Sequence, residues 1–459
     1  MEGDPLARVR VLAARARAQH RHRHRLRIGV ARRHRARVRG RGRSRRRVAP
    51  ARVAPALSQI PRSTPVSAAV AAEPRERTAA RLLAPDPSPL PRRSRRELLA
   101  EIEASGLTGR GGAAFPTARK LATVARAHRP VVVVNGVEGE PASWKDKVLL
   151  AQNPHLVVDG AVVAARVVGA HEVTFAVGRG NRSVRTHLER ALAERSDGVE
   201  VHLETVPDRF VAGEESALLN FLNGGPAKPT LEKPYERGVL VQNVETLASV
   251  GLVARHGAAW FRQRGTADEP GTVLVTVLGA VRTPGVAEVE LGTTFREVLQ
   301  RFGGLTAFPH ALLVGGYFGT WVRAHDVLDL PLTNVALRPL GARLGARTIA
   351  VLPLDACGVA ESARVLRYLA NESAGQCGPC VFGIPAMADA FERLDVDRLR
   401  RLAPLVAERG ACAHPTGATR FAASAAGVFA DEIERHRAGG CSGAAHPPML
   451  PLGASRDWR

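Results

Sequence analysis

The stretch VVVVNGVEGEPASWKDK, residues 131–147, decides which fold the chain adopts. It begins with a run of valines and continues into glycine and acidic residues, a pattern typical of a buried strand followed by a ligand loop. A similar run, VTFAVG, lies at residues 173–178, and the segment 147–170 between them has helical spacing. Parallel strands that alternate with helices bind ligands beyond their carboxyl ends. The sequence therefore predicts an α/β, Rossmann-like domain over residues 94–265.

Two smaller modules are predicted after this domain. Residues 271–322 read as a strand, a Pro-Gly turn, a second strand and a short helix, the order of a β-grasp module, which we place at 266–340. Helical segments over 353–436, with cysteines at their ends, predict a four-helix bundle within a domain of residues 341–437. The glycine- and proline-rich remainder, 438–459, is expected to be a disordered tail.

The net charge of +23 comes mostly from residues 8–47, which are dominated by Arg and His. Such a segment buries too little apolar surface to fold, so residues 1–93 are expected to be a disordered basic tail and linker. An upstream reading frame translated from an early start codon and an Arg-rich transit peptide are the alternatives. Aromatic residues do not interleave the tail, so a nucleic-acid or anionic-membrane anchor is disfavoured and no nucleic acid is expected as a partner. No apolar run of about 20 residues occurs, so no transmembrane segment is predicted.

A glycine loop, GRGGAAFPTARK at residues 109–120, is the first candidate site. Its backbone N–H groups, the start of the helix that follows and the charge of Lys120 together suit a phosphate group. Taken alone, the loop is equally typical of a tight turn that caps a helix.

Three further loops carry polar residues that suit a ligand. NGVEGEP at 135–141 follows the first strand, AGEESALLNFLNG at 212–224 begins a helix, and KPTLEKPYERGVLVQNVET spans 228–246. Each loop also has an interpretation that needs no ligand, such as an acidic surface loop or carboxylates that only stabilise a helix N-terminus.

In this order, the four loops resemble the flavin-binding, NADH-oxidising F subunit of NADH-quinone oxidoreductase, the 51 kDa chain of complex I. They also resemble its relatives in NAD-linked hydrogenases and formate dehydrogenases. The resemblance covers about residues 105–436, including an SLBB-like β-grasp module and a cysteine-bearing bundle, and it implies FMN, NAD(H) and an iron-sulfur cluster as cofactors. The implied cofactor-binding residues are Gly109, Arg110, Gly111, Gly112, Ala113, Phe115, Lys120, Asn135, Glu138, Glu140, Gly213, Glu214, Glu215, Lys233, Tyr235, Gln242, Asn243 and Thr246.

Within that set, the resemblance assigns different tasks. The glycine loop with Lys120 would hold FMN together with Asn135, Glu138, Gln242, Asn243 and Thr246. The dinucleotide would be contacted by Glu140, Glu214, Glu215 and Lys233, while Phe115 and Tyr235 would stack on NADH. The protein is expected to supply position and electrostatics while the flavin carries the hydride chemistry, so no acid-base catalyst is assigned.

All five cysteines lie in the last quarter of the chain, at positions 357, 377, 380, 412 and 441, a distribution that indicates metal or redox chemistry. The motif ESAGQCGPC at 372–380 resembles the family pattern for a [4Fe-4S] cluster, with Cys377, Cys380 and Cys412 as ligands. Ala374 stands where that pattern has its first cysteine. A cluster with an exchangeable site, a [3Fe-4S] form, rescue by Cys357 or Cys441, and no cluster all stay open.

Other departures also fall at the sites. Ala114 stands where the family loop has glycine, Val137 replaces an acidic residue, and Thr123 stands where a second aromatic residue is expected. These changes indicate a divergent member of the family.

The sequence therefore predicts an NAD(P)H dehydrogenase subunit that takes a hydride onto FMN and passes single electrons to an iron-sulfur site. The resemblance implies a small [2Fe-2S] subunit or another acceptor protein as partner. It also implies a cytoplasmic location, with attachment to the inner face of the membrane through partner subunits as a further option. The alternative is a redox-inactive nucleotide- or flavin-binding scaffold that has lost its cluster.

Overall fold

The computed structural model describes residues 80–441, 443, 446–453 and 457–459. The chain separates into two units, residues 1–64 and 65–459, and every described residue belongs to the second. Residues 1–79, which include the expected basic tail, lie outside the described part.

The first module contains a parallel four-stranded sheet with strand order β3-β2-β1-β4. Its strands are β1 (Val131–Gly136), β2 (Glu172–Gly178), β3 (Glu200–Val206) and β4 (Val239–Asn243). The two predicted strands are confirmed, and all their valines except the partly buried Val131 are almost completely buried. Because Asn135 pairs with Asn243 in register, the carboxyl ends of β1 and β4 bring two amide side chains to one edge. The predicted α/β fold class is thereby confirmed.

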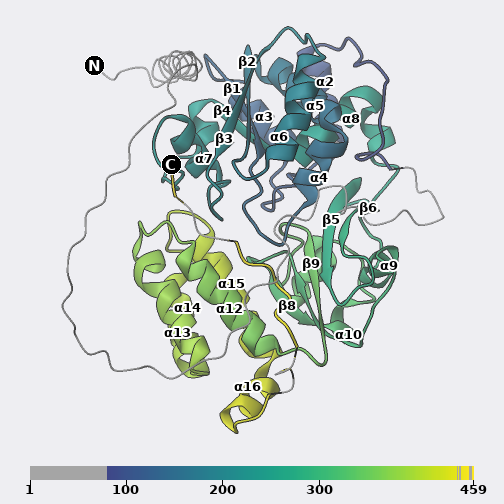
Figure 1. The fold of residues 1–459 in the computed structure, drawn as a ribbon. Coiled ribbons are helices and arrows are strands. Elements are labelled where there is room, and N and C mark those ends of the chain that lie inside the picture. The colour runs from purple at the N-terminus through teal and green to yellow at the C-terminus, as the bar shows by residue number, and fades with distance from the viewer. Residues whose placement is uncertain (1–79, 442, 444–445, 454–456) are drawn as a thin grey trace, which may run out of the picture. The chain divides into compact units, whose positions relative to one another are not determined.

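Helices cover this sheet, as Figure 1 shows. Their bounds are α2 (Arg95–Ala104), α3 (Thr117–Val124), α4 (Lys145–Gln152), α5 (Pro154–Val168), α6 (Arg182–Ala193), α7 (Glu215–Leu222), the 3-10 helix η2 (Pro234–Arg237) and α8 (Val244–Phe261). The segment 147–170, predicted to be helical, forms two helices divided at Asn153, because Pro154 disfavours a helical conformation in the residue before it. Helices α5 and α8 pack closely at Gly160, where an added Cβ would lie 1.7 Å from the carbonyl oxygen of Leu247.

The second module is a five-stranded sheet with order β6-β5-β9-β7-β8. It comprises β5 (Thr272–Gly279), β6 (Gly285–Glu290), α9 (Phe295–Arg301), β7 (Pro309–Val314), β8 (Thr320–Arg323), α10 (Ala324–Val327), α11 (Asn334–Leu337), η3 (Arg338–Leu340) and β9 (Thr348–Pro353). The strand-turn-strand-helix order is as predicted. The predicted end at residue 340 is wrong, because β9 pairs with both β5 and β7 in the middle of the sheet.

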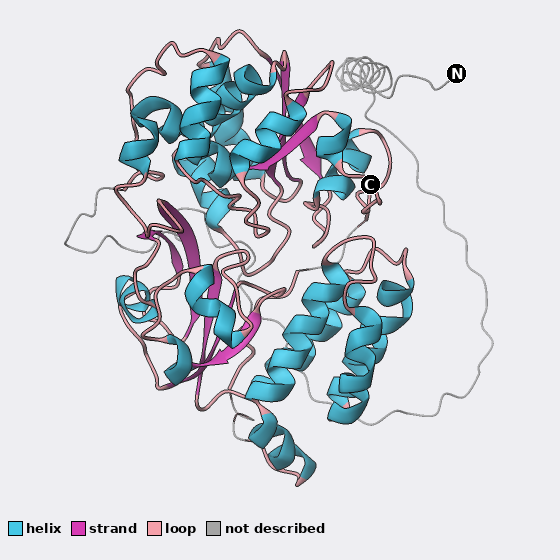
Figure 2. Cartoon of the chain, turned by 180° about the vertical axis from the view of Figure 1, so that it is seen from behind, coloured by secondary structure: helices cyan, strands magenta, loops and turns pink. Residues whose placement is uncertain are grey.

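The third module is helical and begins after β9 (Figure 2). It comprises α12 (Gly358–Asn371), the π-helical turn η4 (Pro379–Gly383), α13 (Ile384–Glu392), α14 (Val396–Val406), α15 (His414–Val428) and α16 (Ala430–Arg437). Its core is continuous with one face of the second module, since Tyr317 and Trp321 are buried in the same apolar cluster as Leu366 and Phe421. The predicted helical bundle is confirmed.

Both segments expected to be disordered have ordered parts. The backbone N–H groups of Arg81, Leu82 and Leu83 donate to the buried carboxylate of Glu288, and Leu82 itself is buried in the main core. At the other end, Leu450 is buried. For these residues the expectation of disorder is wrong. A buried apolar side chain in each segment, Leu82 or Leu450, and a backbone bond to a distant buried carboxylate, Glu288 or Glu361, hold each segment in place.

Within the described residues, no single helix has the length and apolarity needed to cross a membrane. Helices α4 and α5 pass that test only as a pair, with a bend of 97° between them.

Candidate functional site

The glycine loop lies between α2 and α3 and is fastened to the rest of the first module by its backbone. The N–H of Gly109 donates to the carbonyl of Phe115 (2.8 Å), and the N–H of Arg110 donates to Thr246 Oγ1 (2.7 Å). The loop turns through left-handed conformations at Gly112 (φ +115°) and Ala114 (φ +51°). Ala114 therefore occupies a conformation that favours glycine, at the position where the family pattern has glycine.

The side chain of Arg110 has a structural contact. It is buried, and its Nη2 donates to the carbonyl of Pro270 at 3.0 Å. Burial, together with the nearby charge of Arg347, lowers the pKa of Arg110 to about 9. Arg347 also donates to the carbonyl of Arg110, so this pair joins the loop to the second module.

The ends of β1 and β4 meet the glycine loop. Asn135 donates to the carbonyl of Gly213 (2.7 Å). Asn243 caps α8 by accepting from the N–H of Glu245 (3.0 Å), and an added Cβ on Gly111 would lie 3.2 Å from its side chain. The structure thus brings together the predicted glycine loop, the end of the predicted strand β1 and Asn243, with Gln242 buried beside them.

Glu138 organises the loop after β1. Its carboxylate accepts from Ser143 Oγ (2.6 Å) and from the N–H groups of Asp146 and Lys147 (both 3.1 Å) at the start of α4. Its own backbone has φ +40°, a strained conformation for a residue with a side chain. Such strain is typical of functional loops whose surroundings fix the backbone.

Glu140 connects the first module to the second. Its Oε1 accepts from the N–H of Tyr317 at 3.1 Å, and an added Cβ on Gly316 would lie 2.2 Å from the same oxygen. Burial raises the pKa of Glu140 to about 8, although the hydrogen bond from Tyr317 opposes that shift.

The predicted residues around α7 form a second polar group. Lys120 Nζ donates to the carbonyl of Val241 (2.8 Å) and forms an ion pair with Glu215. Glu214 caps α7 by accepting from the N–H groups of Ser216 and Ala217 (both 3.0 Å), and burial raises its pKa.

Two of the predicted aromatic side chains meet at the edge of this group. The rings of Phe115 and Tyr235 are stacked, with centroids 6.4 Å apart and planes inclined by 25°. Phe115 is 40% exposed, and the guanidinium of Arg119 lies 5.9 Å from its ring centre. Lys233 lies on the exposed turn before Tyr235. The arrangement offers an aromatic face flanked by positive charge.

The three family cysteines gather between α12 and α15. The N–H of Cys380 donates to the carbonyl of Cys377 at 3.0 Å in one tight turn, and Cys412 lies in the loop before α15. Burial and the charge of Cys377 raise the pKa of Cys380 to about 12. Burial also raises the pKa of Cys412 to about 11, with contributions from Glu214 and Cys377. The charge of Cys377 therefore acts on both other thiols.

Cys377 differs from the other two thiols. Burial alone would raise its pKa, but hydrogen bonds from the backbone N–H groups of Ala411 and Cys380 lower it below its usual value. Ala374 is buried at the position of the missing ligand and has no donor atom. Cys357 and Cys441 lie with Glu432 and His436 in a separate group, so neither supplies the fourth ligand in this structure.

Three family models match separate parts of the chain. The Nuo51 FMN-binding domain matches residues 102–252, the SLBB domain matches 274–316, and the NADH-ubiquinone oxidoreductase-F iron-sulfur binding region matches 360–436. The F subunit of NADH-quinone oxidoreductase from Mycobacterium tuberculosis H37Rv is 31% identical over 382 residues, covering 75% of this chain and 86% of that protein. The chain belongs to the family of the NADH-quinone oxidoreductase F subunit.

Another member of this family and one solved structure agree with the assignment. The F subunit of the Escherichia coli NADH-quinone oxidoreductase is 28% identical over 372 residues, covering 74% of this chain and 84% of that protein. The NAD+-reducing [NiFe]-hydrogenase in the H2-reduced state contains a chain with a TM-score of 0.70 and 28% identity. The match covers 77% of this chain and 64% of the hydrogenase chain.

The residues present fit the family's two cofactors to different degrees. Every predicted flavin and nucleotide residue lies inside the FMN-binding match, and backbone glycines face Asn243 and Val137 at positions where a side chain would narrow the site. Cys377, Cys380 and Cys412 supply three of the four thiolates that a [4Fe-4S] cluster needs, while Ala374 leaves the fourth position without a protein donor.

A buried charge group beneath the glycine loop was missed by sequence reasoning. Lys145 Nζ lies 2.6 Å from Asp146 Oδ1 and 2.8 Å from Glu245 Oε2, and Asp146 Oδ2 accepts from Asn243 Nδ2 at 2.7 Å. Burial opposes the charge of Lys145, but Asp146 and Glu245 raise its pKa. The motif WKDK was visible in the sequence, yet nothing in it showed that these charges are buried.

Phe210 was also missed, and it links the nucleotide region to the cysteine region. Its N–H donates to Glu372 Oε2 (2.9 Å), the residue that begins the cysteine motif, and Arg209 forms an ion pair with the same oxygen (3.2 Å). Its ring packs edge to face against Tyr368 (6.0 Å) and His414 (5.8 Å). Burial lowers the pKa of His414 to about 4, so the imidazole there is neutral near physiological pH.

Proposed function

We propose that this chain oxidises NADH with FMN and passes the electrons, one at a time, through an iron-sulfur cluster to an acceptor protein. The observation that carries the proposal is the convergence of the glycine loop, the β1 and β4 ends and the α8 cap. That convergence rests on the bond from Arg110 N–H to Thr246 and on the contact of Gly111 with Asn243. Membership in the F subunit family supports the same activity.

FMN, when bound, takes up two electrons with a hydride and returns them singly. The chain's own residues would bind and orient it. The loop N–H groups and the ammonium of Lys120 suit the phosphate, since both place positive charge at a helix start. The remaining flavin contacts would come from Asn135, Glu138, Gln242, Asn243 and Thr246.

The dinucleotide would bind against Phe115 and Tyr235, whose stacked rings offer apolar area to a purine. Glu140, Glu214, Glu215 and Lys233 would line its path. Lys120 pairs with Glu215, which is 41% exposed at its side chain, so a ligand can reach this ion pair. These residues would hold the nicotinamide beside the flavin and exclude water there.

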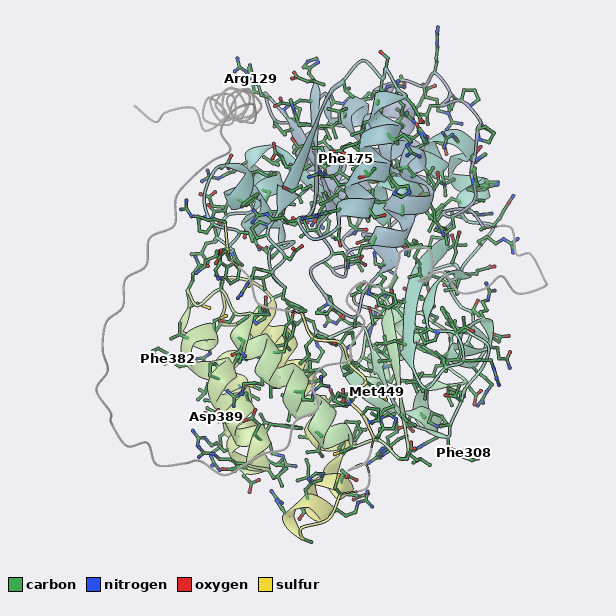
Figure 3. The ribbon with its side chains drawn as sticks, in the orientation of Figure 1. Arg129, Phe175, Phe308, Phe382, Asp389 and Met449 are labelled. Atoms are coloured by element: carbon green, nitrogen blue, oxygen red, sulfur yellow. The ribbon has the colours of Figure 1, made fainter. Side chains whose placement is uncertain are left out.

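Electrons would leave through Cys377, Cys380 and Cys412 toward a partner, which we propose is a small [2Fe-2S] subunit or another acceptor protein. Val381 and Phe382 follow Cys380 directly and are 43% and 75% exposed, and Figure 3 shows Phe382 at the outer side of the helical module. Exposed apolar side chains beside a redox centre suit a protein acceptor. We place the chain in the cytoplasm, held at the inner face of the membrane by such partners.

The test is an anaerobic measurement of flavin, iron and sulfide in the purified full chain, followed by addition of NADH. We expect about one FMN and about three or four irons per chain, with visible absorbance bleached by NADH. A colourless protein that NADH leaves unchanged would overturn the proposal.

Ala374 supports one competing function, a flavin- or nucleotide-binding scaffold without electron transfer. The variant Ala374→Cys separates the two candidates, because a fourth thiolate completes a [4Fe-4S] site. If the wild type is active, its iron content of about three per chain should rise to about four in Ala374→Cys. A wild type without iron, whose iron content the added cysteine restores, would favour the scaffold.

A further inference from the structure

A second group of metal-ligand side chains lies at the end of the helical module, outside the predicted cluster. Cys357 directly precedes α12, Glu432 and His436 are one turn apart on α16, and Cys441 follows that helix. Each offers one donor atom, and these atoms all lie within 4.8 Å of one another. Cys357 Sγ is 3.1 Å from His436 Nε2, which in turn is 3.3 Å from Glu432 Oε1.

The donor set is chemically specific. Two sulfurs, one imidazole nitrogen and one carboxylate oxygen are ligands that Zn²⁺ accepts, and four protein donors are typical of a closed, tetrahedral structural site. Hard cations such as Mg²⁺ and Ca²⁺ prefer oxygen ligands, so they do not fit this set.

Neighbouring groups orient the donors. The N–H of Ala360, in the first turn of α12, donates to Cys357 Sγ at 3.2 Å. Arg435 donates to Glu432 Oε2 at 2.7 Å, while Oε1 of the same carboxylate faces His436. The Glu432 side chain is 1% exposed and Cys357 is buried, so two groups that can carry negative charge meet in a place shielded from water. Arg435 balances one of these charges, and a divalent cation would compensate the other.

Two of the four donors fall outside the family's iron-sulfur binding region, which spans residues 360–436. Cys357 precedes that region and Cys441 follows it. The group is therefore not part of the cluster motif carried by Cys377, Cys380 and Cys412.

The group is placed to fasten the C-terminal segment. The backbone of Gly443 lies against Cys357, since a Cβ added to Gly443 would be 2.1 Å from the backbone nitrogen of Cys357. Farther along, the N–H of Leu450 donates to Glu361 Oε2 at 3.0 Å. Residues 457–459 lie against the first module, called the nucleotide-binding module from here on. The Trp458 ring lies 4.1 Å from the guanidinium of Arg209, and the Trp458 carbonyl accepts from the N–H of Ala227 at 2.9 Å.

We propose that Cys357, Glu432, His436 and Cys441 bind a structural Zn²⁺ ion that fixes the C-terminal segment across the three modules. The ion would join the start of α12 to the end of α16. Because its four ligands come from the protein, it would have no open position for substrate.

The test measures zinc and iron together in the full chain, purified anaerobically with a thiol reductant. We expect about one zinc per chain in the wild type and a loss of at least about tenfold in Cys441→Ser, with iron unchanged. The matched control is Cys412→Ser, which should lose iron and keep zinc. If Cys441→Ser lost iron and kept zinc, Cys441 would be a cluster ligand and the proposal would be wrong.

A second measurement uses a spectroscopic probe and guards against misfolding. His436→Ala removes a partly exposed donor. Thermal unfolding of His436→Ala and Cys441→Ser shows whether these two variants still fold. Addition of Co²⁺ to zinc-stripped wild type should give the intense visible bands of a tetrahedral thiolate site, which both variants should lack. A wild type without such bands, or one whose Cys357 and Cys441 are found joined as a disulfide under the same reducing conditions, would overturn the proposal.

Discussion

The nucleotide-binding module and the helical module differ in how they hold their expected ligand residues. In the nucleotide-binding module, Asn135, Glu138 and Thr246 each have a protein partner, so the site keeps its shape through many replaceable hydrogen bonds. In the helical module, three thiols on two loops are the expected cluster ligands, and Ala374 has no donor. Loss of one contact should therefore weaken the first site gradually but should disable the cluster site almost completely.

The largest expected effect is at the cluster. Cys377→Ser should reduce bound iron by at least about tenfold, because only two matched thiolates would remain, while flavin content should stay unchanged. Iron, sulfide and flavin analysis of the purified variant measures both. Cys441→Ser, which removes a cysteine outside this group, is the control. Iron retained in Cys377→Ser would show that this region does not depend on individual ligands.

Glu140 tests the first module through pH. Its folded pKa, raised to about 8 by burial, means that the folded chain keeps a proton that the unfolded chain releases above its usual value of 4.5. The stability from this proton is fully present below about pH 4.5 and is lost as the pH rises through about 8. Between these limits, the free energy of unfolding should fall by about 1.4 kcal/mol per pH unit from this group alone.

Glu140→Gln should remove that pH dependence. Urea unfolding of the cofactor-free chain at about pH 6 and about pH 8 gives the slope for each protein. Glu236→Gln, at an exposed position of η2, is the control and should keep the wild-type slope. Parallel slopes for the wild type and Glu140→Gln would show that the carboxyl is ionised in the folded chain.

The contrast between the modules also marks what the sequence could predict. Strand β1 was found because its valines form one short apolar run, and Asn135 was placed at a ligand site by the rule that ligands bind at strand ends, whereas Asn243 came only from the family resemblance. Strand β9 was missed because its partners β5 and β7 lie far away in sequence. The same limit explains the ordered ends, since the burial of Leu82 and Leu450 depends on distant carboxylates at Glu288 and Glu361.

The contact partners of individual side chains were the least predictable part of the site. Arg110 was expected to contact a cofactor, yet its guanidinium binds the carbonyl of Pro270. Cys357 and Cys441 were considered as replacements for one missing ligand, and the structure pairs them with Glu432 and His436. Residue types and spacing identified the chemistry, but which donors meet was decided by the packing of α12 against α16.

A smaller effect is expected at the aromatic pair. Phe115→Ala removes the exposed ring that stacks on Tyr235 and should raise KM for NADH by about tenfold, with little change in kcat, because the ring would bind the purine without touching the reacting atoms. Steady-state kinetics with an artificial electron acceptor measures both constants. Phe308→Ala, which removes a ring that is 82% exposed in the second module, should leave them unchanged. Equal effects of the two variants would remove Phe115 from the binding site.

The smallest expected effect is at Ala114, and it separates backbone strain from ligand contact. Ala114→Gly should stabilise the chain by about 1 kcal/mol, because glycine adopts φ +51° without the steric cost that a Cβ imposes. Urea unfolding measures the gain, and Ala113→Gly in the same loop, whose φ is not positive, should instead lose stability. If Ala114→Gly tightened FMN binding without changing stability, the methyl group would act on the ligand and the loop backbone would carry no strain. If neither stability nor FMN binding changed, Ala114 would have no cost in the first module. Of Ala114 and Ala374, only Ala374 would then alter a site.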